Sequence, residues 1–472
     1  MSVGKKSLIG YLPGITNGVI ILIILLYIGI AQDWKKPNRV IESDVMGYYL
    51  YLPAVVINND LTLQYISKNL DFYRNRVWFQ IIPDNKKIIQ YTYGLSLLYS
   101  PFFLTAHLVA PVFGYEANGY TVPYKIALLA SCIFYIIIGL IFLRKILSRY
   151  FSPLVVSITL FSLAIGTNLL YYATTEAPMS HAYNFTLVVL FLYLMIKWIE
   201  KPAWLTTVLL GLITGLITLI RPTNGLVIIL FFLWGVTSLR SFRERLIFLL
   251  RSSWKILLMM VVFIIVWIPQ FLYWHKITGS YFFFSYGDRA WFFFNDPQIV
   301  NVLFSYRKGW FLYTPLMMLS IIGIPFLLKY LKESFLAVTV FAVLNIYIIS
   351  SWCFWWYGGS FGLRAFIDTY GILALPLAGF ITWILKRKII IRIALLFLLV
   401  VMVAHNNFEI AQYKNGAIHF VSMTKKAYWE SFGKLKPTQQ FYKYLEFPDY
   451  NGVEKRIHEA KMKKEEKKSL KK

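Results

Sequence analysis

The run IESDVMGYYLYLP, from Ile41 to Pro53, follows a strongly apolar segment and carries a carboxylate beside a row of tyrosines. This order places Asp44 within a few residues of a membrane surface. A carboxylate shielded by Tyr48 could take a proton from an acceptor hydroxyl, with Glu42 and Tyr48 contacting the substrate. The alternative is structural, because Ser43 or Asp44 could instead cap the helix that VMGYYLYL begins.

A second acidic site is expected in YYATTEAPMSHAYNF, the short turn between two later apolar segments. Glu176 could serve there as a base or orient an acceptor. His181, close by in the same turn, could bind a phosphate or donate a hydrogen bond. The alternative is that Thr175 or Ser180 caps the following helix and Glu176 lies at its solvated start.

Several cations stand at the ends of apolar segments, where the predicted topology disfavours them. A bound phosphate would explain them, because a guanidinium offers paired donors to phosphate oxygens and an ammonium a point charge. The alternatives are snorkelling to lipid headgroups or pairing with Asp288 and Asp296. These cations are Arg221 in LIRPTNG, Arg307 and Lys308 in FSYRKGWFLYTP, and Arg364 in WWYGGSFGLR.

The segment SWCFWWYGGSFGLR, residues 351–364, combines aromatic side chains with glycines just before an apolar run. Glycines let the backbone approach a ligand, and aromatic faces suit sugar rings, which makes Trp356 and Tyr357 candidate substrate contacts. An ordinary interfacial aromatic belt is the alternative. No phosphate-binding glycine loop, dinucleotide fingerprint, zinc-protease motif or nucleophile elbow is present, so a soluble nucleotide cofactor is not expected.

The elements that must position these residues are membrane helices. The chain is 58% hydrophobic and only 15% charged, more apolar than a soluble core can bury, which indicates an all-α polytopic membrane protein. Its net charge of +26 comes from lysines and arginines in short clusters between apolar runs. That pattern follows the positive-inside bias and argues against nucleic-acid binding.

Eleven apolar segments are long enough to be predicted spans, given that about 20 residues cross a bilayer and short helices need fewer. The segments are 15–31, 124–143, 153–172, 182–199, 203–220, 224–239, 256–274, 310–328, 335–351, 364–385 and 389–404.

A further apolar stretch, Gly94 to Phe113, is excluded because counting it as a span would place the Arg144 to Arg149 cluster outside. It is interpreted as an interfacial or re-entrant helix. The transmembrane module then covers 1–404, with outer loops at 32–123 and 275–309, and an outer tail covers 405–472, its last dozen residues disordered. The basic clusters expected on the cytoplasmic side are Lys5/Lys6, 144–149, 197–201, 240–255, 329–332 and 386–392.

In this order of features the chain resembles the GT-C superfamily of integral-membrane glycosyltransferases, particularly the bacterial protein-mannosyltransferase and lipid A aminoarabinose-transferase type. The resemblance rests on Asp44 soon after the first span and on YTYGLSLLYSPFF, from Tyr91, in the long first loop. Glu176 matches the second acid by position only, and WWYGGSFGLR is similar to a Gly-Gly-x-Phe-Gly-x-Arg pattern in bacterial relatives. The Lys-Pro-Pro run of the aminoarabinose type is missing, which leaves sugar and acceptor open.

The resemblance implies inverting transfer of a sugar from a polyprenyl-phosphate donor to a lipid, glycan or protein acceptor, at the periplasmic face of a bacterial inner membrane. Asp44 would be the general base or orient the acceptor, and the misplaced cations would stabilise the leaving phosphate. Some relatives hold a divalent metal, Mg²⁺ or Mn²⁺, on such acids and others do not. The competing hypotheses are a transporter or flippase for a lipid-linked saccharide, an O-antigen polymerase or ligase, and a non-catalytic scaffold.

Overall fold

The structure, a computed structural model, describes residues 8–74, 76–77, 79–82 and 86–469. Lys5 and Lys6 therefore lie outside the described residues. Helices dominate the described chain, and its two strands, β1 Phe79–Ile82 and β2 Lys86–Ile89, form one antiparallel hairpin in the first loop. The predicted all-α polytopic class is confirmed.

Seven helices in the described part of the chain are long and apolar enough to cross a membrane. Each coincides with one of the predicted spans. They are α1 Leu8–Ala31, α6 Val122–Leu147, α9 Ser180–Glu200, α13 Ser253–Thr278, α18 Lys332–Ser350, α19 Tyr370–Leu385, which the short turn Arg364–Thr369 extends at its start, and α20 Ile389–Lys414.

The other predicted spans fall on shorter apolar helices, because glycine and proline interrupt the runs. Gly166 ends α7, and Pro222 comes two residues after the end of α10. Pro315 separates α15 from α16. Such breaks are tolerated at membrane depth where protein surrounds the backbone. These helices are α7 Pro153–Ile165, α8 Leu169–Thr174, α10 Trp204–Ile220, α11 Ile228–Leu233, α15 Trp310–Tyr313, α16 Leu316–Gly323 and α17 Leu327–Tyr330.

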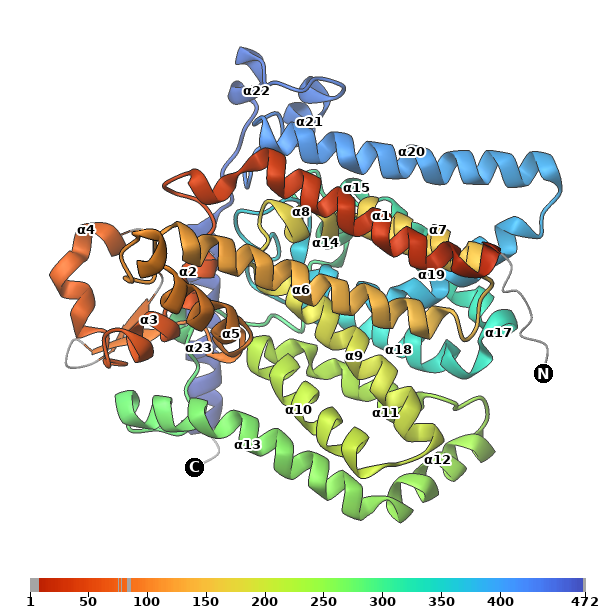
Figure 1. The fold of residues 1–472 in the computed structure, drawn as a ribbon, viewed down its shortest axis with the longest axis horizontal. Helices are drawn as coiled ribbons and strands as arrows, with labels where there is room; N and C mark the ends of the chain where they lie inside the picture. The colour runs from red at the N-terminus through yellow and green to blue at the C-terminus, as the bar shows by residue number, and fades with distance from the viewer. Residues whose placement is uncertain (1–7, 75, 78, 83–85, 470–472) are drawn as a thin grey trace.

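The segments that carry most of the candidate site lie between the spans, at one end of the bundle. In Figure 1 both α1 and α20 run toward the left end, and the Lys414 ammonium lies 5.3 Å from the centre of the Tyr27 ring. The helices at this end are α2 Ser43–Tyr49, α3 Tyr51–Val56, α4 Leu70–Tyr73, α5 Gly94–Val109 and α23 Tyr450–Ser469.

Basic loops gather at the opposite end. Arg149 after α6 pairs with Glu200 at the end of α9, and Lys386 after α19 lies 4.7 Å from the centre of the Tyr330 ring of α17. Lys255, which follows the amphipathic helix α12 Leu239–Arg251, donates to the Pro202 carbonyl at 2.6 Å. The clusters that the positive-inside bias groups together are thus neighbours in space.

The stretch excluded as a span forms α5, a helix of 16 residues that contains Pro101 and is too short to cross on its own. One face packs on α6, with Tyr99 and Phe103 buried, while Leu104 and Leu108 are exposed. A helix with one buried and one exposed apolar face suits an interfacial position.

The predicted tail begins inside α20, which continues to Lys414, and then forms α21 Lys425–Ser431, α22 Gln439–Lys443 and α23. From α23, Arg456 pairs with Asp296 and Lys461 with Asp288. The last dozen residues, which composition predicts to be disordered, are helical up to Ser469. Because of these two ion pairs, Asp288 and Asp296, in the loop before α14 Ile299–Phe304, face the tail and not the cations suggested by the sequence.

Candidate functional site

Asp44 lies in the first turn of α2, and both of its carboxylate oxygens bind side chains from other parts of the chain. Oδ2 lies 2.8 Å from Nη2 of Arg364, and Oδ1 accepts a hydrogen bond of 2.7 Å from the Tyr91 hydroxyl. The side chains of Asp44 and Arg364 keep 21% and 16% of their surface exposed. The pair is therefore ordered by contacts and still open to a ligand.

The helix-capping alternative does not describe Asp44. The N-cap of α2 is Glu42, and no side chain accepts a hydrogen bond from the backbone at that cap. Glu42 itself points to Arg76, with 3.2 Å between Oε1 and Nη1. Asp44 is thus free of a capping role, and Glu42, a predicted substrate contact, pairs within the first loop.

Small and aromatic residues of α2 set the position of the Tyr91 hydroxyl. A Cβ atom at Gly47 would come within 2.4 Å of the Tyr91 ring, so only glycine allows the ring to lie against the helix there. Tyr48 packs on the same ring at a centroid distance of 4.3 Å, and its hydroxyl reaches Ser180 Oγ at 3.4 Å. Burial raises the pKa of Tyr91 well above its usual value, which keeps its hydroxyl protonated as a donor to Asp44.

A tight turn brings Arg364 to Asp44. Tyr357, Gly358 and Gly362 have φ of 54°, 67° and 58°, the left-handed region in which glycine is favoured. Burial raises the pKa of Tyr357, while Arg221 and Arg364 lower it, so this ring lies near both guanidinium groups. Trp356 is buried instead against the tail, where its indole N–H donates to the Tyr450 hydroxyl at 3.3 Å.

A buried polar cluster lies one turn beyond Arg364 and is centred on Asp368. His181 Nδ1 lies 2.9 Å from Oδ1, and Arg221 Nη1 lies 3.1 Å from Oδ2. The same Oδ2 accepts from the amides of Asn224 at 2.6 Å and Asn184 at 3.2 Å. The Arg221 side chain keeps 21% exposure, so the cluster fixes a guanidinium that a ligand can still reach.

Sequence analysis missed Asp368 because it lies inside a segment that was classed as a span by its apolar composition. The signal was nevertheless present, since an ionisable residue in such a segment is a functional candidate by default. Tyr91 and Asn224 carried no comparable signal. Their roles depend on contacts with residues that are remote in the sequence.

Glu176 lies in the turn between α8 and α9, close to the pair. Burial raises the pKa of Glu176 above its usual value, Arg364 and Arg39 offset part of that rise, and the charge of Asp44 adds to it. The helix that follows has Met179 at its N-cap with no side-chain capping bond, so neither Thr175 nor Ser180 caps it. Glu176 is therefore a second carboxyl within electrostatic reach of Arg364.

Asp44 is the more acidic of the two carboxyls. Burial alone raises its pKa, but Arg364 and the hydrogen bond from Tyr91 outweigh burial, and the net pKa lies below the usual range. The two acids are thus shifted in opposite directions by their surroundings. Such divergence is typical of carboxyls with different tasks in one site.

Arg307 and Lys308 hold the tail. Arg307 Nη1 donates to the carbonyls of Val421 at 2.8 Å and Glu446 at 3.0 Å. The Lys308 ammonium is buried and donates to the carbonyls of Ser360 and Phe420. Burial lowers the pKa of Lys308 well below its usual value. Its two hydrogen bonds connect the 351–364 turn to the tail.

The surroundings of Asp44 do not fit a divalent cation. Its oxygens already face a guanidinium and a phenol, whereas Mg²⁺ and Mn²⁺ prefer several oxygen ligands around them. Across the residues that the structure describes, no group of three or more His, Cys, Asp or Glu side chains is arranged to hold a metal ion.

The fold is similar to that of a solved oligosaccharyltransferase. This structure is the oligosaccharyltransferase of Archaeoglobus fulgidus in its apo form, which matches with a TM-score of 0.50 and 12% sequence identity. The match covers 95% of this chain and 62% of that protein, so this chain spans less than two thirds of its length. No protein-family model matches the sequence, and no curated protein matches it.

Proposed function

We propose that the protein is a glycosyltransferase that moves a sugar from a polyprenyl-phosphate-linked donor to a lipid, glycan or protein acceptor. One observation carries the proposal, the partly exposed ion pair of Asp44 and Arg364. It joins a candidate base to a candidate phosphate ligand at one point. The oligosaccharyltransferase fold supports the same class of reaction.

In this proposal the reaction is a single displacement with inversion. The acceptor oxygen attacks the anomeric carbon from the face opposite the phosphate and passes its proton to Asp44. The bond between the anomeric carbon and the phosphate oxygen breaks, and its electron pair leaves on the lipid phosphate. A phosphate departs without being protonated, so one carboxylate suffices where a glycosidase needs two.

Arg364 couples the two halves of the site. Its guanidinium has donors enough to keep Asp44 and also bind a phosphate oxygen. Because Arg364 holds the pKa of Asp44 low in the free protein, Asp44 is ionised at neutral pH but is a weak base. A phosphate that draws the guanidinium toward itself would strengthen Asp44 as a base when the donor is bound.

The other groups have supporting parts. Arg221, held by Asp368, which His181 also contacts, supplies a second guanidinium for the phosphate charge as it develops. Glu176, whose pKa is raised, is suited to orient the acceptor hydroxyl. Tyr48 and Tyr357, which lie near Arg221 and Arg364, would contact the substrate.

The orientation is part of the proposal. The basic loops lie at the end of the bundle opposite Asp44, and such loops stay on the cytoplasmic side. Asp44 would therefore face the periplasm of a bacterial inner membrane.

The proposal is tested by transfer assays in extracted membranes with a panel of labelled polyprenyl-phosphate sugars. We expect a labelled product from at least one donor, with the released polyprenyl phosphate in equal amount. Movement of the intact donor across vesicles without product would instead identify a transporter. Neither product nor movement with any donor would contradict the enzyme and favour a scaffold.

A further inference from the structure

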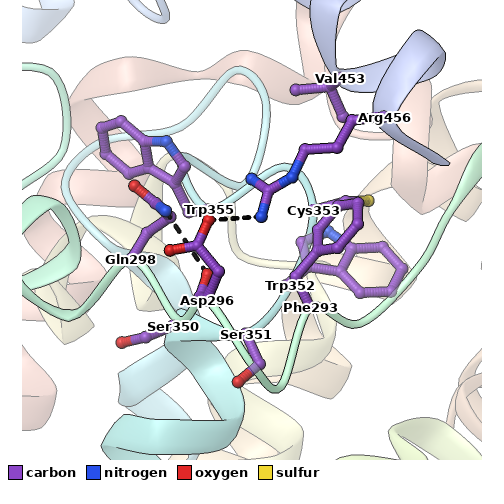
Figure 2. A pocket seen from close by; sticks show the side chains of 10 residues that line it. All are labelled: Phe293, Asp296, Gln298, Ser350, Ser351, Trp352, Cys353, Trp355, Val453 and Arg456. Atoms are coloured by element: carbon purple, nitrogen blue, oxygen red, sulfur yellow. Dashed lines mark hydrogen bonds and ion pairs between the residues drawn. The ribbon is translucent and has the colours of Figure 1, made fainter. Parts of the chain in front are cut away.

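A cavity of about 120 Å³ lies at the same end of the bundle as Asp44, outside the groups used in the proposed reaction. Figure 2 shows that three separate segments build it: the loop before α14, the turn after α18, and α23 of the tail. Because α23 supplies one wall, the tail has a defined place in the site.

The lining combines aromatic faces with charged and amide groups. Trp352 and Trp355 come from the turn after α18, while Asp296 and Arg456 pair across the opening. Gln298 adds an amide, whose Nε2 donates to the Asp296 backbone carbonyl at 3.4 Å. Indole faces pack on the apolar faces of sugar rings, and neighbouring carboxylate, guanidinium and amide groups match hydroxyls, which donate and accept in turn.

The end of α18, at Ser350, forms one wall of the cavity. Ser350 is fully buried, and its Oγ has no hydrogen-bond partner within the described residues. Its backbone is fixed, since the Gln298 N–H donates to the Ser350 carbonyl at 2.7 Å. Because this residue is closed off, it gives the cavity a fixed wall and offers a ligand no hydroxyl contact.

Aromatic contacts connect the cavity to Asp44. The Trp352 ring lies 5.6 Å from that of Tyr286, and Tyr286 lies 6.4 Å from Tyr91, measured between ring centroids. The Tyr91 hydroxyl donates to Asp44. A chain of sugar units could therefore follow these rings from the cavity to the reacting centre.

We infer that this cavity is a carbohydrate-binding subsite, which holds one sugar unit of a glycan while Asp44 acts on another. The inference rests on the proposed function for the role of Asp44, but the binding itself needs no turnover. The glycan could belong to the donor or to the acceptor.

The test uses the full-length protein, purified in detergent, labelled and applied to an immobilised glycan array. Trp355 is the informative position because it is only partly buried and, of the described aromatic rings, contacts only Trp356. We expect wild type to bind a defined subset of glycans, and Trp355→Ala to weaken that binding at least tenfold. Trp254→Ala, an indole that is 72% exposed at the basic end, is the matched control and should bind as wild type.

Asp296→Asn provides a second variant that keeps the shape of the cavity and should weaken binding in the same glycans. Equal binding by wild type and both cavity variants, or no glycan bound by wild type, would overturn the subsite. Where transfer is active, a raised KM for the acceptor assigns the bound unit to the acceptor, and a raised KM for the donor assigns it to the donor. Glycan binding that depends on Trp355 without any transfer would refute the proposed function and leave the subsite standing.

Discussion

Arg364 Nη2 lies 2.8 Å from Asp44 Oδ2, although Asp44 follows the first span and Arg364 begins one of the last. Glycines make the contact possible in two places: Gly47 lets Tyr91 lie close against α2, and a glycine turn precedes Arg364. Four residues further on, Asp368 holds Arg221. The short segment from Arg364 to Asp368 thus supplies both the cation that pairs with Asp44 and the carboxylate that pairs with Arg221.

Asp44→Asn should abolish sugar transfer, with a loss of at least about 100-fold, which is the range for a lost general base. The amide is nearly the same shape and can still accept from Tyr91, so the protein should fold and still bind the donor. The measurement is product formation with the labelled donor. Asp71→Asn, in the same loop at an exposed position, is the control and should retain wild-type activity. Undiminished transfer by Asp44→Asn would remove the base assignment.

Arg364→Lys keeps the charge but loses the planar fork that can hold a carboxylate and a phosphate together. We expect kcat/KM for the donor to fall about 10- to 100-fold, which corresponds to about 1.4 to 2.8 kcal/mol. Initial rates over a range of donor concentrations provide the measurement. Arg289→Lys, an exposed arginine in the later outer loop, serves as the matched control. Equal kinetics in both variants would show that Arg364 does not contact the phosphate.

The class of fold was predictable from the sequence, because apolar runs and basic clusters follow directly from the cost of placing charge in a bilayer. The helix lengths were less so. Residues 310–328 form one apolar run by composition, yet Pro315 divides it into α15 and α16. Hydropathy averages over a proline that ends a helix, so breaks inside apolar runs were not seen.

The site was predictable only in part. Asp44 and Arg364 each stood out alone, as charges at the edges of apolar segments, but their pairing depends on tertiary packing. Arg307 looked equivalent to Arg221 in the sequence, whereas Arg307 holds backbone carbonyls of the tail and Arg221 a buried carboxylate. A charge at a span edge shows that a partner is needed and does not identify the partner.

Asp368→Asn should destabilise the protein, because it leaves the guanidinium of Arg221 without its counterion. Removing one partner of a buried pair costs on the order of 3 kcal/mol, and the partial exposure of Arg221 reduces that figure. Unfolding in detergent measures the loss. The double variant Arg221→Gln, Asp368→Asn should cost clearly less than the sum of the single variants. Simple additivity would mean that the two side chains do not interact in the folded protein.

Lys308→Met should loosen the tail without affecting donor binding. The carbonyls of Ser360 and Phe420 would lose their donor, at about 1 to 3 kcal/mol for each buried acceptor left unpaired. Limited proteolysis should cut the tail faster than in wild type, while KM for the donor stays the same. Lys434→Met, which removes an exposed ion pair on the tail, is the control. A raised donor KM with an intact tail would support the phosphate-binding role predicted from the sequence.

Glu176→Gln should change how stability depends on pH. The folded pKa of Glu176 is raised, so its contribution to stability is fully present below about 4.5, the unfolded value, and is lost as pH rises through the folded pKa. Glutamine has no such loss, so the unfolding temperature of the variant should gain on that of wild type between pH 4 and pH 8. Glu430→Gln is the matched control of opposite sign, because Lys434 and Thr438 lower the pKa of that exposed carboxyl. Its variant should lose ground to wild type as pH rises. Parallel curves for wild type and Glu176→Gln would show that Glu176 is solvated, which would leave it unsuited to orient an acceptor.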